Sequence, residues 1–338
     1  MNTQIIEMIN VSREITWNSW AVQYFFLIGI SIGGMLLSIP AFVFRRRELE
    51  SMGRIGLVVA LSTGLVAPVA LVSDLHQPAR FYQFYLHFTP SSWMSWGSFF
   101  LPAYLLSLLA YAFSVYRAVA DREQAVIRML GGITLLTGLL VALYTGSEMG
   151  ILISRPLWNT AWLGVLFLIT AMSGAAGMGL LLNRFLGNDE FTALKLKRYM
   201  FIYLLLGIVL QLTWMFAGLM GLSQSGEQLM RLGEEYLPLD MLFFGLFLGG
   251  IVPLGLSAGK SGYAWLAGFL AVFGAWMFRW NMFIGGQGIP KNAAGFYFDE
   301  LTFGTEDVLG IIGSLGLWVV LLLLIIRFLP LQKRKTQA

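Results

Sequence analysis

The sequence predicts an all-α integral membrane protein, and three observations support that fold class. First, 57% of the 338 residues are hydrophobic and 12% are charged, with a mean hydropathy of +0.74, whereas soluble domains carry about 25% charged residues. Second, the apolar residues form runs close to the roughly 20 residues that a helix needs to cross the hydrocarbon core. Third, these runs lack the alternation of apolar and polar residues that is typical of a membrane barrel.

Nine apolar runs can be read along the chain, and each predicts one membrane-spanning helix. The runs cover residues 19-44, 53-73, 95-119, 126-151, 158-186, 197-223, 238-259, 262-285 and 307-329. We expect a single integral membrane domain over residues 1-338. Within it, the first four runs (about 19-151) and the next four (about 158-285) form two helical bundles, and the ninth run is an additional helix.

The connections between the runs differ in their content of Lys and Arg. Those after the first, third, fifth and ninth runs hold several basic residues each, and the seventh run is followed by Lys260. The alternate segments carry a single basic residue each, namely Arg13, Arg80, Arg155, Arg231 and Lys291. Because basic connections stay in the cytoplasm, this pattern predicts a multi-pass membrane protein with its N-terminus outside and its C-terminus cytoplasmic. The net charge of +4 is accounted for by this asymmetry, so we expect no nucleic-acid partner.

The Cys and His content limits the redox chemistry of this chain. The sequence contains no cysteine, which excludes disulfides, thiolate-held zinc and cysteine-ligated iron-sulfur clusters within the chain. Its two histidines, His76 and His87, lie close together in one connection, whereas a haem held by two imidazoles needs histidines that face each other. We therefore expect no haem and no metal in this chain, and any such centre must belong to a partner.

Polar side chains at the ends of five apolar runs are predicted to meet on the outer side of the membrane. A tyrosine at a helix end is often an interfacial anchor, and Asp74 with Arg80 is also consistent with a simple interfacial ion pair. Polar groups at this depth usually face a protein or water-filled interior, however. A quinol needs such a site, because an apolar slot must hold its ring while polar groups bind and deprotonate its hydroxyls. The candidate residues are Asn18, Tyr24, Asp74, His76, Tyr144, Glu148 and Arg279, and the seventh run, at residues 238-259, contributes the polar group of Asp240.

Several segments resemble the NrfD/PsrC family of membrane subunits. They are "SDLHQPARFYQFYLHFTPSSWMSWGSFFLP", "LYTGSEMGILISRPLWNTAWLGVLFL" and "FRWNMFIGGQ", and the start of the first helix is most similar to the tetrathionate-reducing branch. The resemblance implies a haem-free, quinol-oxidising membrane anchor that uses menaquinone or another quinone. It also implies two partners, a four-cluster iron-sulfur subunit and a periplasmic molybdopterin catalytic subunit, which reduces an acceptor such as tetrathionate, polysulfide or thiosulfate. Contact with membrane lipid and a dimer of such complexes are further expectations.

The resemblance also assigns roles to the candidate residues. Tyr144 matches the tyrosine of the family's "YTG" motif that binds the quinone head group, and Tyr24 falls where a family member has a histidine. We expect His76, steered by Asp74, to supply the missing imidazole and accept a proton. Glu148 then passes protons to the outer water, and Asn18 lies near the quinone site. Arg279 is expected to keep the Glu148 carboxylate charged, because a nearby opposite charge favours ionisation.

A secondary transporter or a proton-translocating protein is the alternative function. Glu148 and Arg279 within apolar runs, together with the interruption of a run at Pro253, are features of discontinuous transport helices. Against this alternative, the candidate charged groups gather on one side of the membrane and do not line a path to both faces. The sequence also shows no matching interruption in the other half of the chain.

Overall fold

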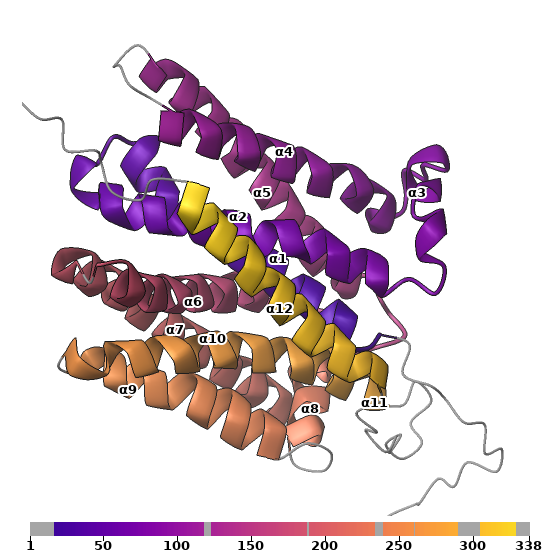
Figure 1. Ribbon diagram of the computed structural model, residues 1–338. Helices are drawn as coiled ribbons and strands as arrows, with labels where there is room; N and C mark the ends of the chain where they lie inside the picture. The colour runs from indigo at the N-terminus through magenta and orange to yellow at the C-terminus, as the bar shows by residue number, and fades with distance from the viewer. Residues whose placement is uncertain are drawn as a thin grey trace, which may run out of the picture.

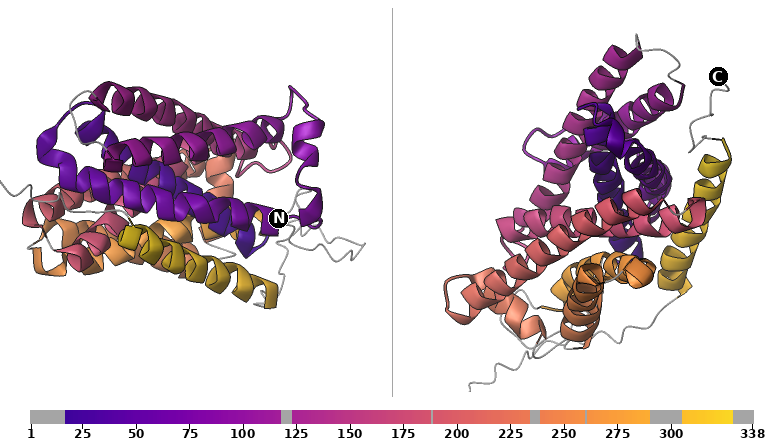
Figure 2. Two further views of the ribbon diagram at one scale, coloured as in Figure 1. Left: turned by 45° about the horizontal axis from the view of Figure 1, so that its top comes forward. Right: turned by 90° about the vertical axis from the view of Figure 1, so that its left-hand side faces the viewer.

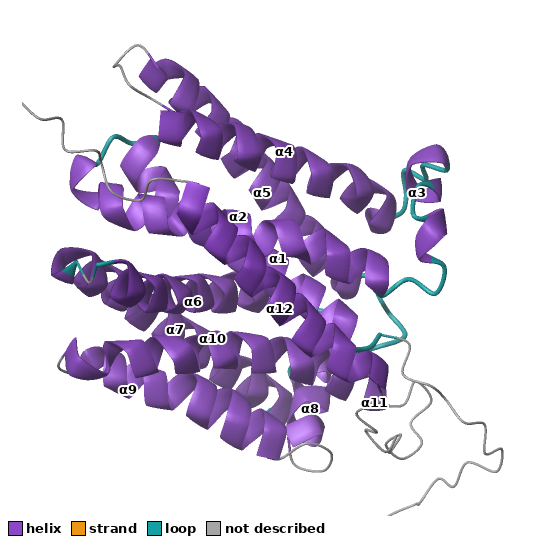
Figure 3. Cartoon of the chain, in the orientation of Figure 1, coloured by secondary structure: helices purple, strands orange, loops and turns teal. Residues whose placement is uncertain are grey.

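The computed structural model describes residues 17–117, 123–187, 189–233, 239–259, 261–289 and 305–328, and helices dominate these segments (Figure 3). No β-strand occurs within these ranges. Nine helical stretches of the described chain are long and apolar enough to cross a membrane. This result confirms the predicted all-α polytopic fold class.

The spanning elements follow one another along the chain with short connections. They are α1 (Ser19–Phe42), α2 (Glu50–Ser73), α4 (Trp93–Arg117), α5 (Gln124–Gly150), α6 (Ala161–Leu186), α7 (Glu190–Leu219), the π-helix η5 (Leu239–Ile251) continued by α9 (Val252–Ala258), α10 (Ala264–Trp280) continued by the π-helix η7 (Asn281–Gly285) and α11 (Gly286–Gly288), and α12 (Thr305–Phe328). The shorter elements are η1 (Arg47–Leu49), η2 (Pro78–Arg80), α3 (Gln83–Leu86), α8 (Gln224–Arg231) and η6 (Ser261–Tyr263).

Four helices form the centre of the described structure. In α1, α2, α6 and α10, 72% or more of the most apolar segment is buried within the protein, against 39% or less in the other spans. Helix α1 packs along both α2 and α6, and α6 packs along α10. Helix α12 crosses α1 and α2 on the outside (Figures 1 and 2). The peripheral helices therefore present apolar side chains to lipid, while the central ones present them to each other.

The closest contact between α1 and α2 is made by two glycines. A Cβ atom on Gly34 would lie 2.7 Å from the carbonyl oxygen of Gly56, and a Cβ atom on Gly56 would lie 2.6 Å from that of Gly34. Both distances are too short for a real carbon atom, so the two backbones touch directly. Lipid tails are as apolar as the side chains, and close packing of this kind is what drives helices together in a membrane.

Several predicted helix boundaries are wrong, and the caps explain the differences. Helix α7 begins at Glu190 and not at residue 197, because the Asp189 carboxylate accepts a hydrogen bond from the Thr192 N–H at 3.2 Å and so caps the helix. Helix α6 begins at Ala161 and not at residue 158, because the Thr160 hydroxyl accepts from the Trp162 N–H at 3.3 Å. Hydropathy depends only on the apolar character of the residues, so it does not reveal these capping hydrogen bonds.

The predicted division into two bundles stays a prediction. Helices α1 and α5 both contact α6 in addition to their neighbours in the first half of the chain, so the two halves share an extensive contact. The predicted sides of the two chain ends fall on residues 1–16 and 329–338, which lie outside the described residues. The orientation in the membrane is therefore also still a prediction.

We predict that Gly56→Ala lowers the stability of the helical core. The added methyl group would push against the Gly34 carbonyl, and overpacking of this kind typically costs about 1–3 kcal/mol. Thermal unfolding of the purified chain in mild detergent measures the effect. Gly132→Ala is the matched control, since no neighbouring atom of the described chain lies within 4 Å of the corresponding Cβ position on α5. Equal melting temperatures for the two variants would contradict the proposed backbone contact.

Candidate functional site

A cavity of about 260 Å³ lies at the end of the protein where α1 begins and α2 ends. Its wall combines residues of α1, α2, α4 and α5 with aromatic residues of the segment between α2 and α4, namely Phe81, Phe84 and Tyr85. Most of the lining is apolar. Its ionisable side chains are Tyr24, Asp74, Tyr85, Tyr144 and Glu148. An apolar cavity with a few converging polar groups is the usual form of a small-molecule site.

Tyr144, Glu148 and Tyr24 form one group of interacting side chains in this cavity. Tyr144 and Glu148 lie one helical turn apart on the same face of α5, and the Tyr144 hydroxyl interacts with both the Glu148 carboxylate and the Tyr24 hydroxyl. Tyr24 is fully buried on α1, and its hydroxyl has no partner of good hydrogen-bond geometry among the described residues. A buried hydroxyl of this kind is suited to receive a polar group of a ligand.

Gly97 determines where the Tyr144 ring lies. A Cβ atom on Gly97 would lie 2.2 Å from Cζ of the Tyr144 ring and 2.3 Å from Cε2. The ring therefore packs directly against the backbone of α4, in space that any other residue at position 97 would fill. Gly97 could not be selected from the sequence, because a glycine in an apolar run carries no signal that distinguishes a ring contact from ordinary helix packing.

Asp74 also lines the cavity and lies directly after the last residue of α2. Its carboxylate accepts hydrogen bonds from the backbone N–H groups of Asn18 and Ala21, at the start of α1. Burial raises the pKa of Asp74 to about 6, although these hydrogen bonds and the charge of His76 act in the opposite direction. A carboxyl group with this pKa can bind and release a proton near neutral pH.

Trp17, which also lines the cavity, is held by residues far away in the sequence. Its backbone N–H donates to Oε1 of Gln287 at 3.1 Å, and Nε2 of Gln287 donates to the Trp17 carbonyl at 2.8 Å. The Trp17 ring stacks on Trp158 at 5.6 Å, and the Trp158 indole donates to the Met282 carbonyl at 2.7 Å. Gln287 of α11 and Trp158 of the connection between α5 and α6, which is itself bound to η7, thus fix the start of α1 and with it one wall of the cavity.

The side chains of the two histidines and of Asn18, which were predicted for the site, do not belong to the described lining of the cavity. His76 and His87 are both exposed, and among the described residues neither histidine lines the cavity. His76 still acts on the site through its electrostatic interaction with Asp74. Asn18 lies beside the cavity through its backbone N–H, which donates to the Asp74 carboxylate, and its part in binding a quinone stays a prediction.

Arg279 lies outside the cavity and is almost fully buried, with 1% of its surface exposed. Its Nε donates to the Phe25 carbonyl at 3.1 Å, and Nη2 donates to the Phe167 carbonyl at 2.8 Å. Nη1 donates to Oγ1 of Thr170 at 2.9 Å and to the carbonyl of Ala275 at 2.8 Å. Every one of these acceptors is neutral.

The geometry corrects the expectation that Arg279 is the counter-ion of Glu148. Among the ion pairs between described residues, none joins these two side chains. The reason is that the guanidinium group is directed towards carbonyl and hydroxyl oxygens of α1, α6 and α10. Arg279 nevertheless lies directly behind the site, because the Phe25 that it binds lines the cavity.

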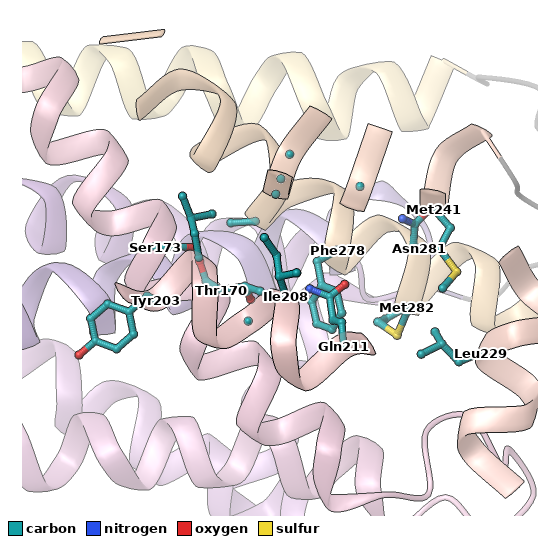
Figure 4. Close-up of a pocket in the computed structure, with 17 residues that line it drawn as sticks. Thr170, Ser173, Tyr203, Ile208, Gln211, Leu229, Met241, Phe278, Asn281 and Met282 are labelled. Atoms are coloured by element: carbon teal, nitrogen blue, oxygen red, sulfur yellow. The ribbon is translucent and has the colours of Figure 1, made fainter. Parts of the chain in front are cut away.

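A second cavity lies on the other side of Arg279, between α6, α7, η5 and α10 (Figure 4). Its volume is about 40 Å³, enough for roughly two or three water molecules. Thr170, which binds Arg279, contributes to its wall together with Ser173 and Gln211. This cavity is far smaller than the one at Tyr144 and does not have room for an aromatic ligand.

The fold and the larger cavity together define a class, namely a polytopic helical membrane protein with a mainly apolar cavity at one end of its spanning helices. A family model described as Polysulphide reductase, NrfD matches residues 7–291. The chain belongs to this family, which confirms the resemblance identified from its sequence motifs. It is accordingly a multi-pass protein of the bacterial inner membrane.

Three relatives illustrate the similarity. The chain is 29% identical over 328 residues to a tetrathionate reductase subunit of Salmonella typhimurium, covering 95% of this chain and 94% of that protein. It is 24% identical to a selenate reductase subunit of Mesobacillus selenatarsenatis, over 82% of this chain and 76% of the relative. It is 26% identical to the Hdr-like menaquinol oxidoreductase integral membrane subunit of Archaeoglobus fulgidus, over 62% and 50% of the two chains.

We predict that Arg279→Met destabilises the protein strongly. The change removes the hydrogen bonds from the guanidinium group to the Phe25 and Phe167 carbonyls of two other helices, and a hydrogen bond to a charged group contributes about 1.5–3 kcal/mol. Thermal unfolding in detergent should show a large decrease in melting temperature. Arg184→Met is the control, because Arg184 is exposed at the end of α6. A melting temperature of Arg279→Met equal to that of the control would rule out the proposed role of the guanidinium group.

Proposed function

We propose that this chain is the quinol-oxidising membrane subunit of a respiratory reductase complex. The observation that carries the proposal is the cavity that is lined both by the interacting side chains of Tyr24, Tyr144 and Glu148 and by Asp74. The enrichment of basic residues at the opposite end of the helices supports a position of this cavity on the outer side of the membrane. The name of the menaquinol oxidoreductase relative agrees with a quinol substrate.

The cavity suits the two chemical parts of a quinol. Its apolar and aromatic wall would hold the ring, and the cavity lies within reach of the lipid phase from which an isoprenoid tail would extend. The hydroxyl group of Tyr144 would bind one oxygen of the ring, with the unpartnered Tyr24 hydroxyl beside it. Menaquinol or another quinol is the proposed substrate, and the chain itself would hold no haem or metal.

The carboxylates would accept the protons of the reaction. Oxidation of a quinol to a quinone releases two electrons and two protons, and a positioned base typically accelerates such a proton transfer by about 10²–10⁴-fold. Glu148 would receive one proton through Tyr144, and Asp74 would receive the other directly. His76, which is exposed and interacts with Asp74, would then pass that proton to the outer water.

The two electrons would leave to a partner protein. We propose an iron-sulfur subunit with four clusters as the acceptor, followed by a molybdopterin catalytic subunit that reduces tetrathionate, polysulfide or thiosulfate. The relatives named as subunits of tetrathionate and selenate reductases support membership of such a complex. A dimer of the complex is part of the same proposal.

We predict that Tyr144→Phe abolishes most quinol oxidation without unfolding the protein. The ring still packs against Gly97, but the hydroxyl that binds the quinol oxygen is lost. The assay measures reduction of the terminal acceptor by quinol in the assembled complex, and an artificial electron donor to the catalytic subunit measures the activity that bypasses this chain. We expect the quinol-dependent rate to fall by about 10²-fold and the artificial-donor rate to stay constant.

Tyr82→Phe is the matched control for this experiment. Tyr82 is exposed in the segment between α2 and α4 and does not belong to the described lining of the cavity. Loss of the Tyr82 hydroxyl should leave both the quinol-dependent rate and the artificial-donor rate unchanged. If Tyr144→Phe assembles normally and oxidises quinol at the wild-type rate, the proposed head-group site is in the wrong place.

We predict that the quinol-dependent rate rises with pH through about pH 6 because of Asp74. The pKa of Asp74 is about 6, so the carboxyl group is protonated below this pH and cannot accept a proton from the quinol. Above it, the carboxylate is the dominant form. Asp74→Asn retains an oxygen that can accept the Asn18 and Ala21 N–H groups but removes the base. The quinol-dependent rate of Asp74→Asn should be low and should not change with pH near pH 6. If the rate of this variant still decreases below that pH, a group other than Asp74 causes the pH dependence.

A further inference from the structure

A third cavity lies at the opposite end of the protein from Tyr144 and has an almost entirely apolar wall. Its volume is about 360 Å³. The lining comes from α1, α2, α5, α6 and α7, and includes Pro40, Leu135 and Met172. Among the described residues, Tyr199 and Tyr203 of α7 are the only lining residues that carry a side-chain hydroxyl. An apolar cavity of this size within the spanning region is suited to a hydrocarbon chain.

The arrangement of α5 and α6 explains why this cavity exists. The two helices touch at Gly146 and Gly164, where a Cβ atom on Gly146 would lie 2.7 Å from the Cα atom of Gly164. From this contact they diverge towards the end at which α1 terminates (Figure 1). Leu135 and Leu168 line the cavity on the two diverging helices. The wedge between them is therefore filled only in part by the end of α1.

Three arginine residues follow the lining of this cavity directly in the sequence, at the end of α1. Arg45, Arg46 and Arg47 directly follow the lining residue Phe44, and all three are exposed. None of the three guanidinium groups forms an ion pair with another described residue. Arg54 differs from them, because it is bound to Glu50 at 2.9 Å.

Two further arginines are placed at the same end by the helices that line the cavity. Arg128 lies two turns before Leu135 on the same face of α5, and the intervening Gly131 packs against Val43 near the end of α1. Arg198 directly precedes the lining residue Tyr199 and is exposed. Glu48 in the turn η1 carries a negative charge nearby, so the balance at this end remains strongly positive.

We propose that this cavity binds an anionic phospholipid, with one acyl chain between α5 and α6 and the phosphate group at the Arg45–Arg47 turn. An apolar cavity that ends at a cluster of unpaired guanidinium groups matches both parts of such a lipid. Arginine binds phosphate oxygens through paired N–H groups, and basic sites between membrane helices on the cytoplasmic side bind anionic head groups. A neutral lipid would fill the cavity but leave the arginines without an anionic partner. Inorganic phosphate would pair with the arginines but leave the cavity unfilled.

Lipid binding to the purified full-length chain in neutral detergent tests the proposal. The probes are phosphatidylglycerol and phosphatidylcholine with identical acyl chains, and binding is followed by native mass spectrometry and by the melting temperature. We expect phosphatidylglycerol to bind at least tenfold more tightly than phosphatidylcholine and to raise the melting temperature. Phosphatidylglycerol with very short acyl chains and inorganic phosphate should each have little effect.

The variant Arg45→Gln with Arg46→Gln should lose roughly tenfold or more of the affinity for phosphatidylglycerol. Its matched control is Arg117→Gln with Arg184→Gln, which removes the same charge from exposed residues that do not line the cavity. Equal binding by the two double variants would overturn the assignment of the head group. Equal binding of the two lipids, or of the short-chain and long-chain forms, would overturn the proposal without any variant, so a folding defect cannot obscure the result.

Discussion

The hydrogen bonds of one buried guanidinium group hold the centre of the molecule together. Arg279 of α10 binds the Phe25 carbonyl of α1 and the Phe167 carbonyl of α6. A charge inside a membrane protein is expensive unless polar partners surround it, and here those partners are backbone oxygens of two other helices. The position of α1 depends on this contact, and α1 carries Tyr24 and one wall of the pocket. The proposed chemistry therefore requires a charge that does not itself take part in it.

The fold could be predicted from the sequence more completely than the site. Hydropathy predicted nine spanning helices because each run is long and apolar, and a membrane leaves few other structures for such runs. The boundaries of α6 and α7 were missed because Thr160 caps α6 two residues inside the predicted run and Asp189 caps α7 before the predicted run begins. The π-helices η5 and η7 were also missed, since a change in hydrogen-bond period leaves hydropathy unchanged.

Within the site, several residues chosen as polar side chains at helix ends lie together in the structure, while their roles in binding and proton transfer stay predictions. Tyr24, Asp74, Tyr144 and Glu148 were chosen from their depth, and the structure brings them to one cavity. Arg279 was misplaced because depth along a helix does not say which face a residue occupies. Gly97 and the Gln287 contact to Trp17 could not be foreseen, because both depend on how distant segments meet in space.

The ring of Tyr144 lies flat against the backbone of α4 because position 97 has no side chain. A ring confined in this way has few rotamers left, so its hydroxyl already points in one direction before any ligand arrives. Binding then loses little further conformational entropy at this residue, and rigid groups of this kind raise affinity by reducing the entropy lost on association. For the proposed quinol, the absence of a Cβ atom at position 97 would thus leave a preformed site, in which binding does not require the Tyr144 side chain to reorient.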